Sequence, residues 1–168
     1  MAEYSEKTNV NDIDWNSWIP AERAVLCFIK VDNRLMLIHK KRGLGKGKVN
    51  APGGRIEKDE LPVDAAVRET QEEIGLTPYN LVEMGELHFI FTDGYSLHGV
   101  IFFADSYSGT PVETDEAVPF WCDIDKVPYE DMWEDDHFWL PLLLSGQKMK
   151  GYFIFDNDKM LSHCIEII

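Results

Sequence analysis

The chain has 168 residues, of which 45% are hydrophobic and 12% aromatic, and its formal net charge is −14. This length fits one domain, and the composition is too apolar for a disordered chain. The strong negative charge excludes a broad basic surface for nucleic-acid polymers or anionic membranes. A small anionic substrate stays compatible with it, provided that metal ions supply local positive charge.

The three cysteines, Cys27, Cys122 and Cys164, are far apart and form no CxxC pair. We therefore expect neither a disulfide framework nor a zinc knuckle, and we expect a reducing, cytoplasmic location. The N-terminus has no basic segment followed by an apolar run, and the longest apolar runs have the length of strands. Neither a signal peptide nor a membrane span is expected, and we expect a monomer.

The first third of the chain predicts an arm followed by strands. Residues 1–20 are polar and acidic, and we interpret them as a loose arm whose tryptophans, Trp15 and Trp18, pack back on a domain at 21–168. Residues 23–31 and 34–40 predict two strands, because the "DN" pair between them is typical of a hairpin turn. A long glycine-rich loop follows, with a short strand near Val49.

Helical and strand patterns alternate in the rest of the chain. Apolar spacing predicts a helix at 62–74, with Pro62 in its first turn and Gly75 at its end. Residues 81–91 and 97–105 predict strands, and a further strand lies among acidic loops near 111–125. A second helix is expected from Asp136 to near Gly146, before a closing hairpin. This order predicts an α+β fold, an α/β/α sandwich with a mixed β-sheet and two helices.

Three glutamates lie on one face of the first predicted helix. Glu69, Glu72 and Glu73 are spaced i, i+3 and i+4. Like charges at this spacing disfavour an isolated helix by a few tenths of a kcal/mol, or about 0.2–0.5 per pair. A divalent cation would offset the repulsion, since Mg²⁺ prefers carboxylate and carbonyl oxygens. The alternative is a solvated acidic helix face.

The segment around these glutamates resembles the Nudix box, G-x5-E-x7-R-E-U-x-E-E-x-G-U, in which U is a bulky aliphatic residue. The matching positions are Gly54, Glu60, Arg68, Glu69, Glu72, Glu73, Gly75 and Leu76. Thr70 departs from the pattern, because the family has an aliphatic residue there. The departure leaves the acids intact, and we expect its effect to be on stability.

The resemblance implies hydrolysis of a nucleoside diphosphate linked to another group, with Mg²⁺ or Mn²⁺ as cofactor. It implies that Glu69, Glu72 and Glu73 bind the metal together with the Gly54 carbonyl, and that a glutamate acts as base, without deciding which. Glu116, in a loop beyond the box, is our candidate for a further catalytic and metal-binding acid; the alternative is a surface acid. Arg68 is expected to orient the glutamates, and Glu60 to pair or cap within the loop and helix.

From about Arg23 onward the chain also resembles the animal 8-oxo-dGTP-hydrolysing enzymes of the MutT-related group. That resemblance implies that the nucleoside triphosphate is cleaved to monophosphate and pyrophosphate, which sanitises the nucleotide pool. It also implies a set of residues that contact the purine: Asn50, Phe89, Phe91, Trp133, Asp135 and Asp136. Lys40 belongs to a basic loop that is a candidate to meet the phosphates. The chain departs from this group at Leu44, Val49 and Ala51-Pro52, which alters the expected pocket entrance.

Chemistry supports the base-binding interpretation. A tryptophan can stack on a purine with about 1–3 kcal/mol per base. Of two neighbouring carboxylates, one is expected to be protonated, so Asp135 and Asp136 would present a donor and acceptors together. The alternative is structural: Asp136 caps the second helix, and Trp133 packs in the core.

Other functions share part of this pattern. Another Nudix activity, on ADP-ribose, dinucleoside polyphosphates, caps, isopentenyl diphosphate or unmodified nucleotides, would use the same box. A binding module without enzymatic activity is a second alternative, although such modules usually lose box glutamates. The expected partner is a small nucleotide, not a nucleic-acid polymer or a membrane.

Overall fold

A computed structural model describes residues 7–168, which form two compact units. The first unit comprises residues 7–23, 84–100 and 134–168, and the second comprises 24–83 and 101–133. The strands β6 (Val82–Phe91) and β7 (Ser96–Ala104) have residues in both. The predicted boundary at residue 20 stays a prediction, and residues 1–6 of that arm lie outside the described residues.

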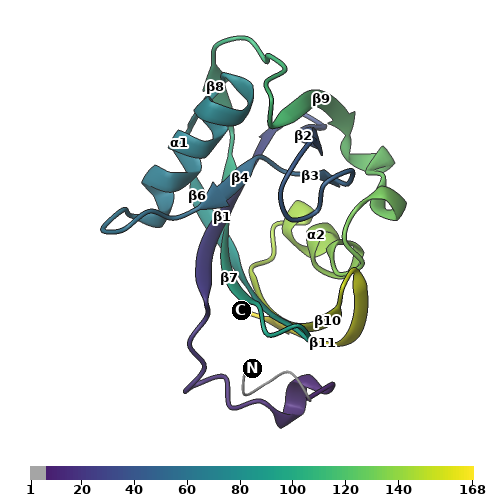
Figure 1. The fold of residues 1–168 in the computed structure, drawn as a ribbon. Coiled ribbons are helices and arrows are strands. Elements are labelled where there is room, and N and C mark those ends of the chain that lie inside the picture. Colours follow the sequence, from purple (N-terminus) through teal and green to yellow (C-terminus); the bar gives the residue numbers. More distant parts are fainter. Residues whose placement is uncertain (1–6) are drawn as a thin grey trace. The chain divides into compact units, whose positions relative to one another are not determined.

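The first unit contains a mixed sheet covered by one helix. Strand β10 (Met149–Asp156) is antiparallel to β11 (Lys159–Ile167) and parallel to β6, which is followed by β7 in the strand order. Helix α2 (Asp136–Leu144) packs on β10 (Figure 1). Its buried residues include Trp139, Leu140 and Leu143. Pro141 lies inside this short helix.

The N-terminal arm, as far as it is described, is anchored in the first unit. Val10, at the start of a short 3₁₀ helix (Val10–Asp12), is buried with Ile13 and Trp18 against β6 and β10. Its backbone N–H donates to Ser162 Oγ at 3.0 Å, and Trp15 Nε1 donates to the Val10 carbonyl at 3.0 Å. The tryptophans therefore pack back on the domain, and the part of the arm from Val10 to Trp18 is not loose.

The second unit is built on the hairpin of β1 (Glu22–Val31) and β2 (Arg34–Lys40), with Asp32 in the left-handed region at φ 55°. Strand β2 also pairs with β3 (Val49–Asn50) and β9 (Ala117–Asp123). Two short strands, β5 (Thr77–Tyr79) and β8 (Ser106–Ser108), pair separately. Two 3₁₀ turns, Ile124–Lys126 and Tyr129–Asp131, follow β9.

The glycine pair ahead of the first helix is a strand, although the sequence indicated a loop. Strand β4 (Gly53–Arg55) pairs antiparallel with β1, and Gly53 lies opposite Leu26. A Cβ at Gly53 would overlap the Val25 carbonyl oxygen, so only glycine allows this close pairing. The pairing fixes β4 beside the helix that follows it.

Helix α1 (Pro62–Ile74) has the predicted bounds. Pro62 suits the first turn, where its missing N–H costs nothing, and Gly75 ends the helix in the left-handed region at φ 75°. The helix lies beside β4 (Figure 1) and also packs on β5 and β9. Its buried residues are Ala65, Ala66, Thr70, Glu73 and Ile74. Val63, in the first turn, is 37% exposed although it is apolar.

The mixed sheet with two helices predicted from the sequence is confirmed. In residues 7–168, no helix combines the length and apolar character needed to cross a bilayer.

Candidate active site

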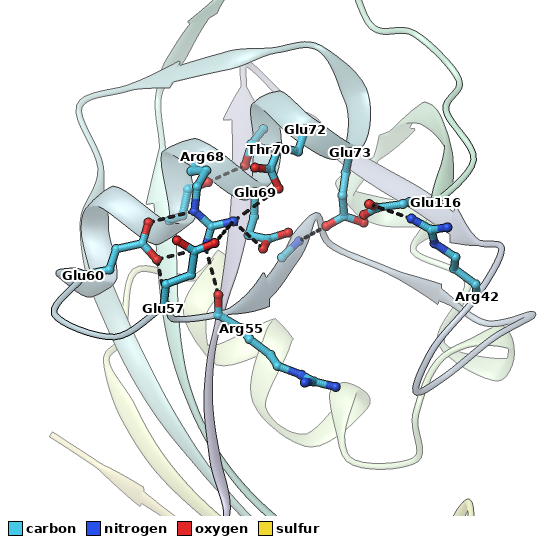
Figure 2. Close-up of polar contacts among 12 residues, drawn as sticks. Arg42, Arg55, Glu57, Glu60, Arg68, Glu69, Thr70, Glu72, Glu73 and Glu116 are labelled. Carbon is cyan, nitrogen blue, oxygen red and sulfur yellow. Dashed lines mark hydrogen bonds and ion pairs between the residues drawn. The ribbon is translucent and has the colours of Figure 1, made fainter.

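Three carboxylates of the second unit converge. Glu69 and Glu73 project from α1, and Glu116 comes from the loop before β9. One oxygen of each lies within 4.8 Å of the others, and Figure 2 shows Glu73 and Glu116 beside each other. Such a set of oxygen ligands is what a hard divalent cation prefers.

Glu73 is the most buried of the three, with an exposed fraction of 2%. Its Oε1 accepts a hydrogen bond from the Gly53 N–H at 2.7 Å, which holds the carboxylate toward β4. Burial disfavours the charged form and raises the pKa of Glu73 from 4.5 to about 7, although this hydrogen bond and Lys40 oppose the shift. A buried acid that ionises near neutral pH is typical of a functional site.

Glu69 is held between β4 and Arg68. Burial raises its pKa above the ordinary value, against the opposing effect of Arg68, whose Nη1 donates to Oε1 at 2.8 Å. A Cβ at Gly54 would overlap the Glu69 carboxyl group. The glycine of the box is therefore required for space, and it places the β4 backbone directly against this acid.

Glu116 is tied to helix α1 by a hydroxyl relay. Thr114 Oγ1 donates to the Glu73 carbonyl at 2.7 Å and accepts from the Glu116 N–H at 3.2 Å. The Glu116 side chain pairs with Arg42 Nη2 at 3.0 Å, and its carbonyl accepts from the Lys41 N–H at 2.9 Å. The third acid is thus fixed from both the helix and the basic loop.

Arg68 is the centre of a second cluster on the same helix (Figure 2). Its Nε and Nη2 donate to the two oxygens of Glu60 at 2.8 and 2.9 Å. Nη1 also reaches Glu72 Oε2 at 3.2 Å, and Nη2 donates to the Arg55 carbonyl at 2.9 Å. The hydrogen bond from Arg68 lowers the pKa of Glu60 to about 2, so this acid stays ionised.

Glu72, predicted to share the metal-binding face, is not one of the three converging carboxylates. It is exposed and pairs with Arg68. At about 100° per residue, positions 72 and 73 lie about 60° and 40° to opposite sides of position 69, so the two edges of the predicted face reach different partners. The structure therefore brings Glu116 to Glu69 and Glu73, and leaves Glu72 at the Arg68 cluster.

Two residues predicted to bind the base, Asn50 and Trp133, lie in the second unit. Asn50 Oδ1 accepts from the Ala51 N–H at 2.8 Å. The ammonium of Lys48 lies 5.1 Å from the centre of the Trp133 ring. A Cβ at Gly45 would come within 2.8 Å of Trp133 Nε1, so the glycine-rich loop packs closely against this indole.

The other predicted base-binding residues lie in the first unit. Phe89 stacks on Phe153 with ring centres 5.2 Å apart, and its ring centre is 6.3 Å from that of Phe91. Asp135 and Asp136 are both buried. Asp135 Oδ2 accepts from Trp139 Nε1 at 2.7 Å, while Oδ1 accepts no hydrogen bond of normal geometry from residues 7–168.

The pKa of Asp135 is raised to about 6, mainly because burial disfavours its charged form and despite the Trp139 hydrogen bond. A raised pKa agrees with the expectation that one of the two aspartates can be protonated. Burial causes the shift, whereas the sequence suggested repulsion between like charges. Asp135 is the N-cap of α2 and Asp136 its first residue, so the alternative cap position was one residue too late.

Three contributors were missed from the sequence. Glu57, in the loop before α1, has its Oε1 3.7 Å from Arg68 Nη1. Thr114 and Arg42 both contact the converging acids, and only their nearness to Glu116 and to the glycine-rich loop hinted at this. A threonine two residues before an acid is too common to carry a prediction.

The sequence and the fold both match known proteins. The family model described as NUDIX domain matches residues 20–143. The chain is 42% identical to an oxidized purine nucleoside triphosphate hydrolase of Danio rerio over 143 residues, 84% of this chain and 92% of that protein. The protein of the same name from Mus musculus is 40% identical over 142 residues, 83% and 91% of the two chains.

A solved structure of a MutT protein from Bacillus halodurans has a similar fold. It superposes with a TM-score of 0.78 at 25% identity, covering 86% of this chain and 97% of the bacterial one.

Proposed function

The chain belongs to the Nudix family, and from this premise we propose that it hydrolyses oxidised purine nucleoside triphosphates, such as 8-oxo-dGTP, to the monophosphate and pyrophosphate. The observation that carries the proposal is the convergence of Glu69, Glu73 and Glu116 within the matched domain. The names of the two vertebrate relatives support the substrate class.

The converging acids fit a divalent cation, which we propose to be Mg²⁺, with Mn²⁺ as a substitute. Glu69, Glu73 and Glu116 would hold it, because their oxygens already lie within 4.8 Å of one another. Gly54 is the candidate to contribute its carbonyl, and Glu72 to complete the set from the Arg68 cluster. When bound, the cation neutralises charge on phosphoryl oxygens and lowers the pKa of an attacking water.

The protein's own contribution is to hold these acids in place. The Gly53 N–H fixes Glu73, Arg68 fixes Glu69, and the Thr114 relay fixes Glu116. A glutamate of this group takes the proton of the attacking water. Lys40, whose charge already acts on Glu73, is the candidate to meet the phosphates.

Within the second unit, we assign stacking on the purine to Trp133 and a polar contact with the base to Asn50. The close packing of Gly45 supports a fixed indole orientation. Within the first unit, we assign hydrogen bonding to the base edge to Asp135 and Asp136, with Phe89 and Phe91 as aromatic neighbours. The buried Oδ1 of Asp135 supports this assignment, because within residues 7–168 it accepts no hydrogen bond of normal geometry, and a ligand could supply one.

A substrate panel tests the proposed reaction. With Mg²⁺ present, pyrophosphate release from 8-oxo-dGTP and 2-hydroxy-dATP should exceed release from dGTP, and both should be cleaved faster than ADP-ribose is cleaved to AMP and ribose phosphate. Fast phosphate release, or a preference for ADP-ribose or dinucleoside polyphosphates, would favour the alternative Nudix activities.

A variant tests the assignment of the base edge. Asp135→Asn keeps the size of the side chain and its acceptor oxygen but cannot ionise, so discrimination among oxidised purines should change. The matched control is Asp158→Asn, in the exposed turn between β10 and β11 of the same unit. Unchanged turnover of Asp135→Asn across the oxidised purines would refute the role.

A further inference from the structure

A second group of potential metal ligands lies in the first unit, outside the carboxylate cluster. Glu86 and His88 are two residues apart on β6, so their side chains share a face of the sheet, and His98 belongs to β7. One ligand atom of each side chain lies within 4.8 Å of the others. Two imidazoles and a carboxylate are a frequent ligand set for Zn²⁺.

The contacts of His88 determine which of its nitrogens can bind a metal. Its Nδ1 lies 2.9 Å from the Gly151 carbonyl oxygen. A carbonyl can only accept, so Nδ1 carries the proton and Nε2 keeps its lone pair. Tyr152 stacks on the ring at a centroid distance of 4.5 Å and holds its orientation. Metal-binding histidines are commonly oriented in this way, by a hydrogen bond from the other ring nitrogen.

A hydrogen bond joins the side chains of His98 and Glu86, so one proton lies between them. His98 Nε2 lies 2.9 Å from Glu86 Oε1. Tetrahedral Zn²⁺ with bonds of about 2.1 Å separates its ligand atoms by about 3.4 Å. An ion can therefore take the place of the shared proton if the two atoms move apart by about half an ångström, and that proton is released to solvent.

We propose that Glu86, His88 and His98 form a binding site for one divalent transition-metal ion, and that Zn²⁺ is the ion that fits the ligand set. Water would complete the coordination, because the side chains of His98 and Glu86 are 14% and 29% exposed. The other Glu86 oxygen, Oε2, lies 3.5 Å from Lys150 Nζ. Lys150 thus occupies the oxygen that the ion does not use, and its half-exposed side chain can turn away.

Metal binding at this site should also affect the N-terminal arm, because two of its tryptophans pack on His88. The ring centres of Trp15 and Trp18 lie 5.9 and 5.6 Å from that of His88, and both rings are inclined to it. An ion that joins β6 to β7 through His88 and His98 therefore fixes the imidazole on which the arm packs. Zn²⁺ binding should stabilise the arm together with the hairpin.

Zn²⁺ titration of the full chain in millimolar Mg²⁺ tests the site, since Mg²⁺ competes with Zn²⁺ for the oxygen ligands of the carboxylate cluster. Calorimetry should show one Zn²⁺ per chain. Nitrogen-15 spectra of the imidazoles should show large shifts of Nε2 of His88 and His98. His98→Gln should weaken Zn²⁺ binding at least about tenfold, since even changes outside the metal's ligands cost 10–100-fold.

The matched control is His163→Gln, which removes an exposed histidine of the same unit that stacks on Phe138. It should bind Zn²⁺ like the wild type. If His98→Gln does not fold by circular dichroism, Glu86→Gln provides the same comparison. Absence of Zn²⁺ binding by the wild type, unshifted histidine nitrogens, or equal affinity in the folded ligand variants would overturn the proposal.

Discussion

Two groups of carboxylates meet at helix α1, and they differ in how the repulsion among their negative charges is offset (Figure 2). In one, Glu60, Glu72 and Glu69 gather around the guanidinium of Arg68. In the other, Glu73 joins Glu69 and Glu116, with its carboxylate buried. The pKa of Glu60 is lowered to about 2, whereas that of Glu73 is raised to about 7. In the first region the Arg68 guanidinium supplies the positive charge. We expect the second region to bind a divalent metal ion from solution.

The largest effect should come from removing charge in the second region. Glu73→Gln keeps the acceptor for the Gly53 N–H but cannot ionise, so cation binding and turnover should both fall. A loss of turnover of about 10²–10³-fold is expected, the scale for one preorganised electrostatic group. Pyrophosphate release and Mg²⁺ titration measure it, with Glu113→Gln, an exposed acid near the cluster that pairs with Lys41, as control. Wild-type turnover in Glu73→Gln would contradict the proposal that the second region binds the cation needed for turnover.

The two regions should also affect stability with opposite dependence on pH. Because the folded-state pKa of Glu73 is raised from 4.5 to about 7, its contribution is fully present below pH 4.5 and is lost as pH rises through 7. The loss amounts to roughly 3 kcal/mol in the free energy of unfolding. The contribution of Glu60, whose pKa is lowered, is present above pH 4.5 and is lost as pH falls through about 2.

Urea unfolding with chelator, from pH 4 to 8, measures the contribution of Glu73; the loss of the Glu60 contribution lies at lower pH. Glu73→Gln should flatten the decline between pH 4.5 and 7, and it should be more stable than the wild type above pH 7. If the wild type instead becomes more stable across this range, the ionised carboxylate of Glu73 does not carry the desolvation cost that its burial implies.

A smaller effect is expected from the first region. Arg68→Gln removes the donors that hold Glu69 and Glu60, so turnover should fall about 10–100-fold, as for other partners that orient metal ligands. The unfolding midpoint should also fall. Lys58→Gln, which removes an exposed cation from the loop before α1, should change neither quantity. Should Arg68→Gln lose stability but keep its turnover, the two regions of the helix are energetically independent.

The smallest effect is expected at the one position that departs from the box. Thr70 is fully buried, and its hydroxyl donates to the Ala66 carbonyl at 2.7 Å. Thr70→Val should change the free energy of unfolding by less than about 1 kcal/mol, since that carbonyl keeps its place in the helix. Thermal unfolding checks this, and a loss of turnover would show that this residue affects the acids.

The sequence predicted α1 well because the signals for it are local. Pro62 and Gly75 mark its ends, and the spacing of the apolar residues marks the buried face. The contacts within the site depend on more than this local spacing. Helical spacing groups Glu72 with Glu69 and Glu73, whereas in the structure Glu116 joins Glu69 and Glu73, and Glu72 pairs with Arg68.

The longer-range features depended on strand register. The pairing of Gly53 with Leu26 makes a strand of an apparent loop. Glu86, His88 and His98 come together only because β6 and β7 are neighbours with a particular alignment, and nothing in their sequence spacing reveals it. Glu116 could be proposed from the family resemblance, but the Thr114 relay that positions it could not.

That relay has a practical consequence for anyone who redesigns the chain. The Thr114 hydroxyl joins the last turn of α1 to the loop that carries Glu116. A loop graft or a shortened loop can therefore keep the third acid in place only if it keeps a hydroxyl at this position. Serine preserves the connection and valine cuts it, so position 114 is the residue to keep when the rest of the loop is exchanged.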